Sequence, residues 1–185
     1  TSLLNSSNYI SVNDFFSEQT FKSVSKKKAK LIFSIAMFYH LNDPLKLSRE
    51  VAACLDDKGV WIIQMAYLPA MIRTNMYDNI VHEHAGYYGT HHIKWVVEKA
   101  GLEVFDAEEN DVYGGSFRIF VKKKGNKKFA LTDSYRSILN KESERGLFNL
   151  NTYQNFARRI EKTRDDLHDL CRKIKANGKT IWVYG

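Results

Sequence analysis

Cysteine is scarce in this 185-residue chain, which contains only Cys54 and Cys171. Two thiols cannot form a disulfide framework or a four-cysteine zinc site, so both are excluded. No apolar run approaches the ~20 residues that a membrane-spanning helix needs, and no signal-peptide pattern opens the chain. We therefore expect a soluble protein of a reducing, cytoplasmic compartment, with no membrane partner.

Internal repeats and low-complexity linkers are also missing, whereas apolar residues are plentiful. The sequence is 44% hydrophobic and 13% aromatic, which provides for a substantial core and excludes a disordered or fibrous protein. The formal net charge of +7 arises from two lysine clusters, within residues 22–30 and 122–128. Lysine clusters without arginine are typical of a solvated surface, so we expect no nucleic-acid partner.

Two apolar runs flank a helical pattern in the first half of the chain. Residues 29–36 and 60–65 are near-continuous apolar segments, which are typical of strands buried on both faces of a parallel sheet. Between them, Asp43 and Pro44 form a strong helix start, a capping side chain followed by a proline in the first turn. These segments predict a βαβ crossover. A short additional strand is predicted at residues 9–12.

Two further strands are predicted beyond this unit. Thr90 caps a helix over residues 91–100, and strands follow at residues 102–107 and 116–121. Their linker contains Gly114-Gly115 and suits an antiparallel hairpin. A mostly parallel sheet that finishes in an antiparallel hairpin is the topology of class I methyltransferases. The sequence thus predicts an α/β, Rossmann-like fold of this class.

Four of the six histidines, His82, His84, His91 and His92, lie within eleven residues. A metal site is disfavoured because the first two point to different sides of a helix and no cysteine lies near. A histidine beside a glutamate in a loop after a sheet strand instead suits proton abstraction, because its pKa can be held near 7. The alternative is that these side chains only tie down a long loop, and the spacing leaves both interpretations open.

Four short segments carry a resemblance to a known family. Tyr67-Leu68, YDNIVHEH (residues 77–84), Tyr87-Tyr88 and YGGSFR (residues 113–118) resemble, in order and spacing, those of the sugar C-methyltransferases. These are S-adenosylmethionine-dependent enzymes that methylate a carbon of nucleotide-linked keto-deoxysugars. The resemblance covers about residues 9–122, and it implies S-adenosylmethionine as cofactor and a small-molecule substrate, a nucleotide sugar.

The family plan also implies a domain organisation. It has a zinc-binding N-terminal domain, a central methyltransferase domain and a C-terminal Rossmann-like domain. We expect residues 1–125 to be the C-terminal part of the methyltransferase domain and 126–178 a helical connector, with helices at 134–145 and 152–176. Residues 179–185 have the pattern of the first strand of the next domain. The start at Thr1 and the stop after an apolar run suggest that both ends are cut, leaving out the zinc domain and the glycine-rich cofactor loop.

The resemblance also implies roles for individual residues. His84 matches the family's proposed general base and Glu83 its polar partner, with His82 beside them. The base removes a proton next to a ketone, and the enolate carbon then attacks the sulfonium methyl group, mainly helped by positioning. Expected cofactor contacts are Asp14, Phe15, Ser34, Ala36 and Met37. Expected substrate contacts are Tyr67, Tyr87, Tyr88, Tyr113, Gly114 and Arg118.

Two positions depart from the family pattern. Val81 replaces a tyrosine that could donate to the enolate, and Tyr113 replaces a histidine. Either another aromatic residue substitutes, or the substrate is not a keto-sugar. Two alternatives therefore remain, a methyltransferase acting on another small-molecule acceptor and a degenerate methyltransferase fold that acts as a non-catalytic binding module. The oligomeric state is not indicated by the sequence.

Overall fold

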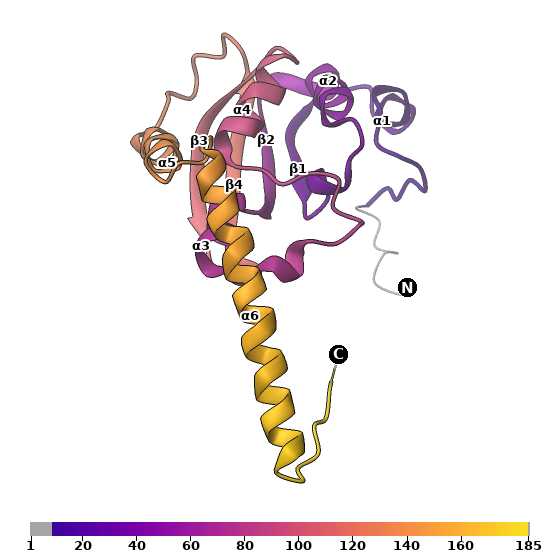
Figure 1. Ribbon diagram of the computed structural model, residues 1–185. Coiled ribbons are helices and arrows are strands. Elements are labelled where there is room, and N and C mark those ends of the chain that lie inside the picture. The colour runs from indigo at the N-terminus through magenta and orange to yellow at the C-terminus, as the bar shows by residue number, and fades with distance from the viewer. Residues whose placement is uncertain (1–8, 185) are drawn as a thin grey trace.

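A four-stranded mixed sheet organises the protein (Figure 1). The computed structural model describes residues 9–184, except for the side chain of Tyr113. The strand order is β1 (Ala29–Ile35), β2 (Leu55–Ala66), β4 (Ser116–Lys123) and β3 (Leu102–Asn110). β1 and β2 are parallel, whereas β4 is antiparallel to both of its neighbours. Three strands thus share one direction, and the predicted sheet with a terminal antiparallel hairpin is confirmed.

The predicted crossover between β1 and β2 is also present. Helix α2 (Pro44–Cys54) begins where the sequence indicates, since the Asp43 carboxylate accepts a 2.8 Å hydrogen bond from the Lys46 amide. Leu47 and Val51 lie on the buried stripe of this helix. It passes directly into β2, so a single continuous segment crosses from one layer to the other.

The core lies on one face of the sheet. Trp61, Ile63 and Met65 of β2 alternate with less buried residues, and β4 contributes Phe117 and Ile119 to the same layer. Helices α2, α4 (Thr90–Glu98) and α5 (Asp133–Glu144) cover this face. Burial of large apolar side chains at about 1.5–3 kcal/mol each makes this layer the main source of stability.

The other face of β1 is uncovered in the part of the chain that the structure describes. Leu31, Phe33 and Ile35 are 47, 58 and 60% exposed, whereas Ser34 between them is buried. The prediction that this strand is buried on both faces is therefore wrong for the described residues. A strand buries both faces only when elements pack on both sides, and no described element covers this side of β1.

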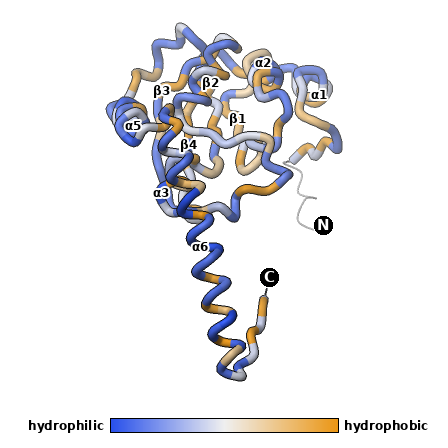
Figure 2. Tube along the Cα trace, in the orientation of Figure 1, coloured by the Kyte–Doolittle hydropathy of each residue, from blue (hydrophilic) through white to orange (hydrophobic). Residues whose placement is uncertain are grey.

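Helix α3 (Leu68–Thr74) and helix α6 (Leu150–Ala176) pack together below the sheet (Figure 1). The cluster contains Leu68 and Ile72 of α3, Phe156 of α6, and Leu147 of the connection between α5 and α6. Beyond this contact α6 projects from the body, and Figure 2 shows its far part as mainly hydrophilic with separate hydrophobic residues. The sequence predicts α5 and α6 to within two residues but misses α3.

Two predicted strands are not formed. Residues 9–12 and 179–184 are not in strands, and Tyr9 and Trp182 are 69 and 89% exposed. A strand needs a neighbour whose backbone groups pair with its own, and neither segment has one within residues 9–184. Gly185 lies outside the described residues, so a C-terminal domain beginning at residue 179 stays a prediction.

The remaining elements are short. Helix α1 (Glu18–Val24) begins at Ser17, whose side chain accepts a hydrogen bond from the Thr20 amide. Three single 3-10 turns, η1 (Phe38–His40), η2 (Tyr77–Asn79) and η3 (Val112–Gly114), lie in the connections. None of the helices within residues 9–184 is both long and apolar enough to cross a membrane.

Candidate active site

A cavity of about 550 Å³ lies at the carboxyl ends of β1 and β2. This is the edge where open α/β sheets bind ligands, and the size suits a small molecule. The strand ends, the long loop after α3 and the start of β4 contribute to its wall. The lining residues are Ile35, Ala36, Tyr39, Gln64, Met65, Ala66, Asp78, Asn79, His84 and Ser116.

The chain leaves β1 through a strained residue. Ala36 has φ 51°, in the left-handed region that residues other than glycine rarely adopt. Its amide donates a 2.9 Å hydrogen bond to the Gln64 carbonyl, which holds the turn against β2. Such strain costs about 1–3 kcal/mol and is concentrated at functional sites. The turn leads directly into η1, so Tyr39 and His40 are brought close to the loop that carries His84.

The hydrogen bonding of His84 determines which ring nitrogen carries the proton. Its Nδ1 lies 2.8 Å from the carbonyl oxygen of Asn79. A carbonyl oxygen can only accept, so Nδ1 carries the hydrogen and Nε2 of the neutral ring keeps a lone pair. The Tyr39 ring contacts His84 with centroids 4.4 Å apart. His84 is therefore held in the tautomer that a general base requires.

A second histidine, His40, lies beside His84. Their ring centroids are 5.1 Å apart, and His40 Nδ1 lies 2.9 Å from the Glu83 carbonyl oxygen. The same reasoning leaves Nε2 of the neutral His40 ring as an acceptor. Glu83 thus acts here through its backbone, while its side chain is exposed. Sequence reasoning missed His40, although its position shortly after a predicted strand was an available signal.

Arg118 reaches the cavity only through Gln64. Its Nε and Nη2 donate to Gln64 Oε1 at 3.1 and 2.8 Å, and its Nη1 donates to Glu108 at 2.5 Å. The partner that an arginine inside an apolar strand needs is thus present. Because the oxygen of the Gln64 amide is engaged, its NH₂ group is the part left to donate in the cavity.

Three predicted substrate residues lie next to His84. Tyr67, Tyr87 and Tyr88 line a small space of about 10 Å³, which shares His84 and Tyr39 with the larger cavity. Tyr87 donates a 3.3 Å hydrogen bond to the Asn79 carbonyl, the same oxygen that holds His84. Tyr67 is fully buried and Tyr88 packs edge-on against a core ring. These tyrosines therefore form the wall behind the histidine.

The other predicted site residues whose side chains the structure describes do not line the main cavity. Asp14 and Phe15 are exposed before α1, and the Asp14 carboxylate accepts a hydrogen bond from the Phe15 amide. Ser34 faces the core, where its hydroxyl accepts the Trp61 indole N–H at 2.9 Å. Met37 packs against the core. His82 is exposed, Gly114 shapes the hairpin with φ 78°, and the side chain of Tyr113 lies outside the described part.

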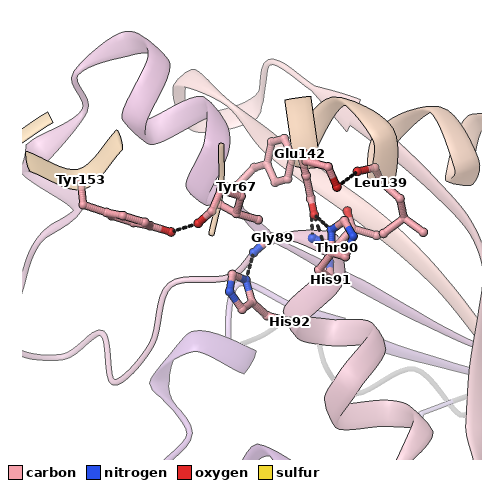
Figure 3. Close-up of polar contacts among 10 residues, drawn as sticks. Tyr67, Gly89, Thr90, His91, His92, Leu139, Glu142 and Tyr153 are labelled. Carbon is pink, nitrogen blue, oxygen red and sulfur yellow. Dashed lines mark hydrogen bonds and ion pairs between the residues drawn. The ribbon is translucent and has the colours of Figure 1, made fainter. Parts of the chain in front are cut away.

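A buried carboxylate braces the site from behind. Glu142 of α5 is fully buried and accepts hydrogen bonds from four donors, which Figure 3 shows converging on it. These are the amides of Thr90 and His91, the His91 ring and the Tyr67 hydroxyl, at 2.5, 3.1, 2.6 and 2.9 Å. Burial, together with this carboxylate, raises the pKa of Tyr67 well above its usual value. The phenol therefore stays a donor, and Glu142 fixes both α4 and the end of β2.

His92 completes the start of α4 by accepting the Gly89 amide on Nδ1 at 2.9 Å, which requires a neutral ring. Burial lowers the pKa of His92. The unfolded chain therefore binds a proton at a higher pH than the folded chain, and stability falls as pH drops below about 6.5.

We expect His92→Gln, which keeps an acceptor but cannot titrate, to show a shallower loss of unfolding free energy between about pH 7.5 and 5.5.

Urea unfolding at the two pH values measures this difference. His168→Gln, on the exposed part of α6, provides the control and should follow the wild-type slope. An unchanged slope in His92→Gln would contradict the assignment of this pH dependence to His92.

Comparisons with known protein families identify the family of this chain. Residues 6–107, more than half of the chain, match the family model described as a methyltransferase domain. The chain belongs to this methyltransferase family, and the α/β fold class predicted from the sequence is confirmed. Residues 111–185 match a second model, described as a C-methyltransferase C-terminal domain. The resemblance to C-methyltransferases drawn from the motifs is thereby confirmed.

One known relative is similar over most of this chain. The chain is 30% identical over 157 residues to the C-methyltransferase NovU of Streptomyces niveus. The match includes 85% of this chain but 37% of NovU, so the chain spans well under half the length of that relative.

Solved structures show a weaker likeness. The O-methyltransferase NcsB1 from neocarzinostatin biosynthesis aligns with a TM-score of 0.45 at 16% identity, covering 56% of this chain and 32% of NcsB1. A methyltransferase from Clostridium acetobutylicum, described as S-adenosylmethionine-dependent, aligns with a TM-score of 0.42 at 13% identity, covering 55% of this chain and 61% of that one. A likeness of this degree does not bear on function.

Proposed function

We propose that this protein is an S-adenosylmethionine-dependent methyltransferase that methylates a carbon next to a ketone of a small substrate. The observation that carries the proposal is the hydrogen bond from His84 Nδ1 to the Asn79 carbonyl. It leaves Nε2 of a cavity-lining imidazole as the acceptor for a proton. Carbon methylation needs such a base, because the carbon becomes a nucleophile only after it loses its α-proton. The similarity to NovU, itself a C-methyltransferase, supports the same reaction.

The residues that line the cavity suit a cofactor with a positively charged sulfonium group. Asp78 is one of the lining residues, and its negative charge favours a sulfonium cation; Ala36 and Gln64 border the cavity at the two strand ends. We propose that Asp78 and Ala36 hold part of S-adenosylmethionine, which supplies an electrophilic methyl group when bound. Positioning the substrate carbon in line with that methyl group is then the main task of the protein.

We further propose that the substrate is a nucleotide-linked keto-sugar and that His84 and Gln64 act on it directly. His84 takes the α-proton, and the Gln64 NH₂ group donates to the oxygen on which negative charge develops. Arg118 positions Gln64 by engaging its amide oxygen. His40 provides a second imidazole next to His84.

Val81 favours a second candidate, methyl transfer to another small-molecule acceptor. This residue is 40% exposed and brings no proton donor to the position where the related motif has tyrosine. Proton exchange separates the two candidates. Methylation of a carbon next to a ketone requires the α-proton to be removed, whereas methylation of an oxygen or nitrogen acceptor involves no α-proton.

Calorimetry of the intact protein with S-adenosylmethionine tests the proposed function. We expect one molecule to bind per chain, and Asp78→Asn to weaken that binding because it removes the carboxylate from the cavity wall. The control is Asp165→Asn, at an exposed position of α6. No detectable binding by the wild type would contradict the proposal and favour a non-catalytic binding module.

A further inference from the structure

A second cavity, of about 460 Å³, lies between α3 and the base of α6. It shares no lining residue with the candidate active site. Three segments form its wall, namely α3, the connection from α5 to α6, and the first turns of α6. The lining residues are Pro69, Ile72, Arg73, Arg145, Leu147, Thr152 and Arg159.

Three arginines from three different segments converge on this cavity. Arg159 donates to the Ile72 carbonyl oxygen, which ties α6 to α3. Arg73 and Arg145 face the single carboxylate of Glu109 at 3.9 and 3.6 Å, longer than an ordinary hydrogen bond. Three guanidinium groups and one carboxylate leave the cavity with an excess of two positive charges.

Most donors of this cluster make no hydrogen bond within the described residues, and the three arginines are exposed to solvent. A guanidinium has five N–H groups, yet the hydrogen bonds of the described chain involve only Arg159 among the three. The bond from Arg159 explains how α6 is attached, but a structural role of this kind needs one arginine. Arg73 and Arg145 share one carboxylate, Glu109, which balances only one of their two positive charges.

We propose that this cavity binds a phosphate-bearing ligand, with a diphosphate group held between the three guanidinium groups. Arginine binds phosphate oxygens through its planar fork, often with two parallel hydrogen bonds. Two excess positive charges match an oxyanion that carries two or more negative charges. The apolar floor of Ile72 and Leu147 excludes water on one side, which strengthens the attraction.

Binding at this cavity has a structural consequence. Arg73 lies in the segment that matches the methyltransferase domain, whereas Arg145 and Arg159 lie in the segment that matches the C-methyltransferase C-terminal domain. A ligand that contacts all three stabilises the junction between the two segments. The site does not depend on the methyl-transfer proposal, because it uses none of the residues of that cavity.

Calorimetry of the intact protein with inorganic diphosphate tests the site. Wild type is expected to bind it, and Arg73→Gln, Arg145→Gln and Arg159→Gln are each expected to weaken binding about tenfold or more. Arg158→Gln is the matched control, since this neighbour on α6 does not line the cavity and bonds to Asn155. Its affinity should stay within about twofold of wild type, and circular dichroism shows that each variant is folded.

Uridine diphosphate in a parallel titration identifies the source of the phosphate. If uridine diphosphate binds more tightly than inorganic diphosphate, the cavity is a nucleotide site. If the two bind equally, it is a site for the free anion. Affinity should also fall steeply between about 50 and 500 mM salt. The proposal is overturned if wild type binds neither compound, or if Arg158→Gln weakens binding as much as the three lining variants do.

Discussion

Replacing His84 by glutamine is expected to lower the rate of methyl transfer at least about 100-fold, the lower range for loss of a general base. The amide of glutamine can still hydrogen-bond to the Asn79 carbonyl, but it cannot accept a proton at neutral pH. Affinity for S-adenosylmethionine should be unchanged, because the base acts on the other substrate. Steady-state kinetics and calorimetry of the intact protein measure the two effects separately.

The matched control for this variant is His168→Gln. His168 is exposed on the projecting part of α6, so kcat should remain at the wild-type level. A His84→Gln protein that retains wild-type turnover would contradict the role of His84. If turnover is retained there but lost in His40→Gln, the proton is taken by the second imidazole of the pair.

Replacing Glu142 by alanine is expected to lower the free energy of unfolding by about 3–5 kcal/mol. Four donors lose their acceptor, including the amides of Thr90 and His91 and the Tyr67 hydroxyl. Thr90 and Tyr67 are fully buried, so their donors cannot turn to water instead. Removing the carboxyl group also leaves a void next to Leu147, close to Gly89.

Urea denaturation followed by circular dichroism measures this loss. Glu144→Ala is the matched control, because Glu144 lies on the same helix but is exposed. It should change stability by no more than about 0.5 kcal/mol. A loss below about 1 kcal/mol in Glu142→Ala would show that water or a rearranged donor set replaces the carboxylate.

Much of the fold could be predicted because local signals and the final packing agree. The Asp43-Pro44 start of α2 is observed as predicted, since capping depends on only four neighbouring residues. The order of the apolar runs also indicates the parallel pair and the hairpin. Whether the second face of β1 is covered is not a local property, and the exposed Phe33 shows that an apolar run alone does not settle it.

The candidate site was predictable only in part. His84 and the neighbouring tyrosines lie together because one loop carries most of them. Ser34 faces the core instead, since strand alternation places it under Trp61, whose indole N–H needs an acceptor. The spacing of Glu142 from Tyr135 and Ile138 puts it on the buried face of α5. Its partners, however, lie 51 to 75 residues earlier and become visible only in the folded chain.

One measurement tests carbon methylation most directly. The intact protein is incubated with S-adenosylmethionine labelled with ¹³C in its methyl group and with a uniformly ¹³C-labelled, nucleotide-linked keto-sugar, and the product is examined by NMR. We expect a methyl signal split by one-bond carbon–carbon coupling, which arises only when the methyl group is attached to a carbon of the sugar. A methyl signal without that coupling, from attachment to oxygen or nitrogen, would contradict carbon methylation by this protein.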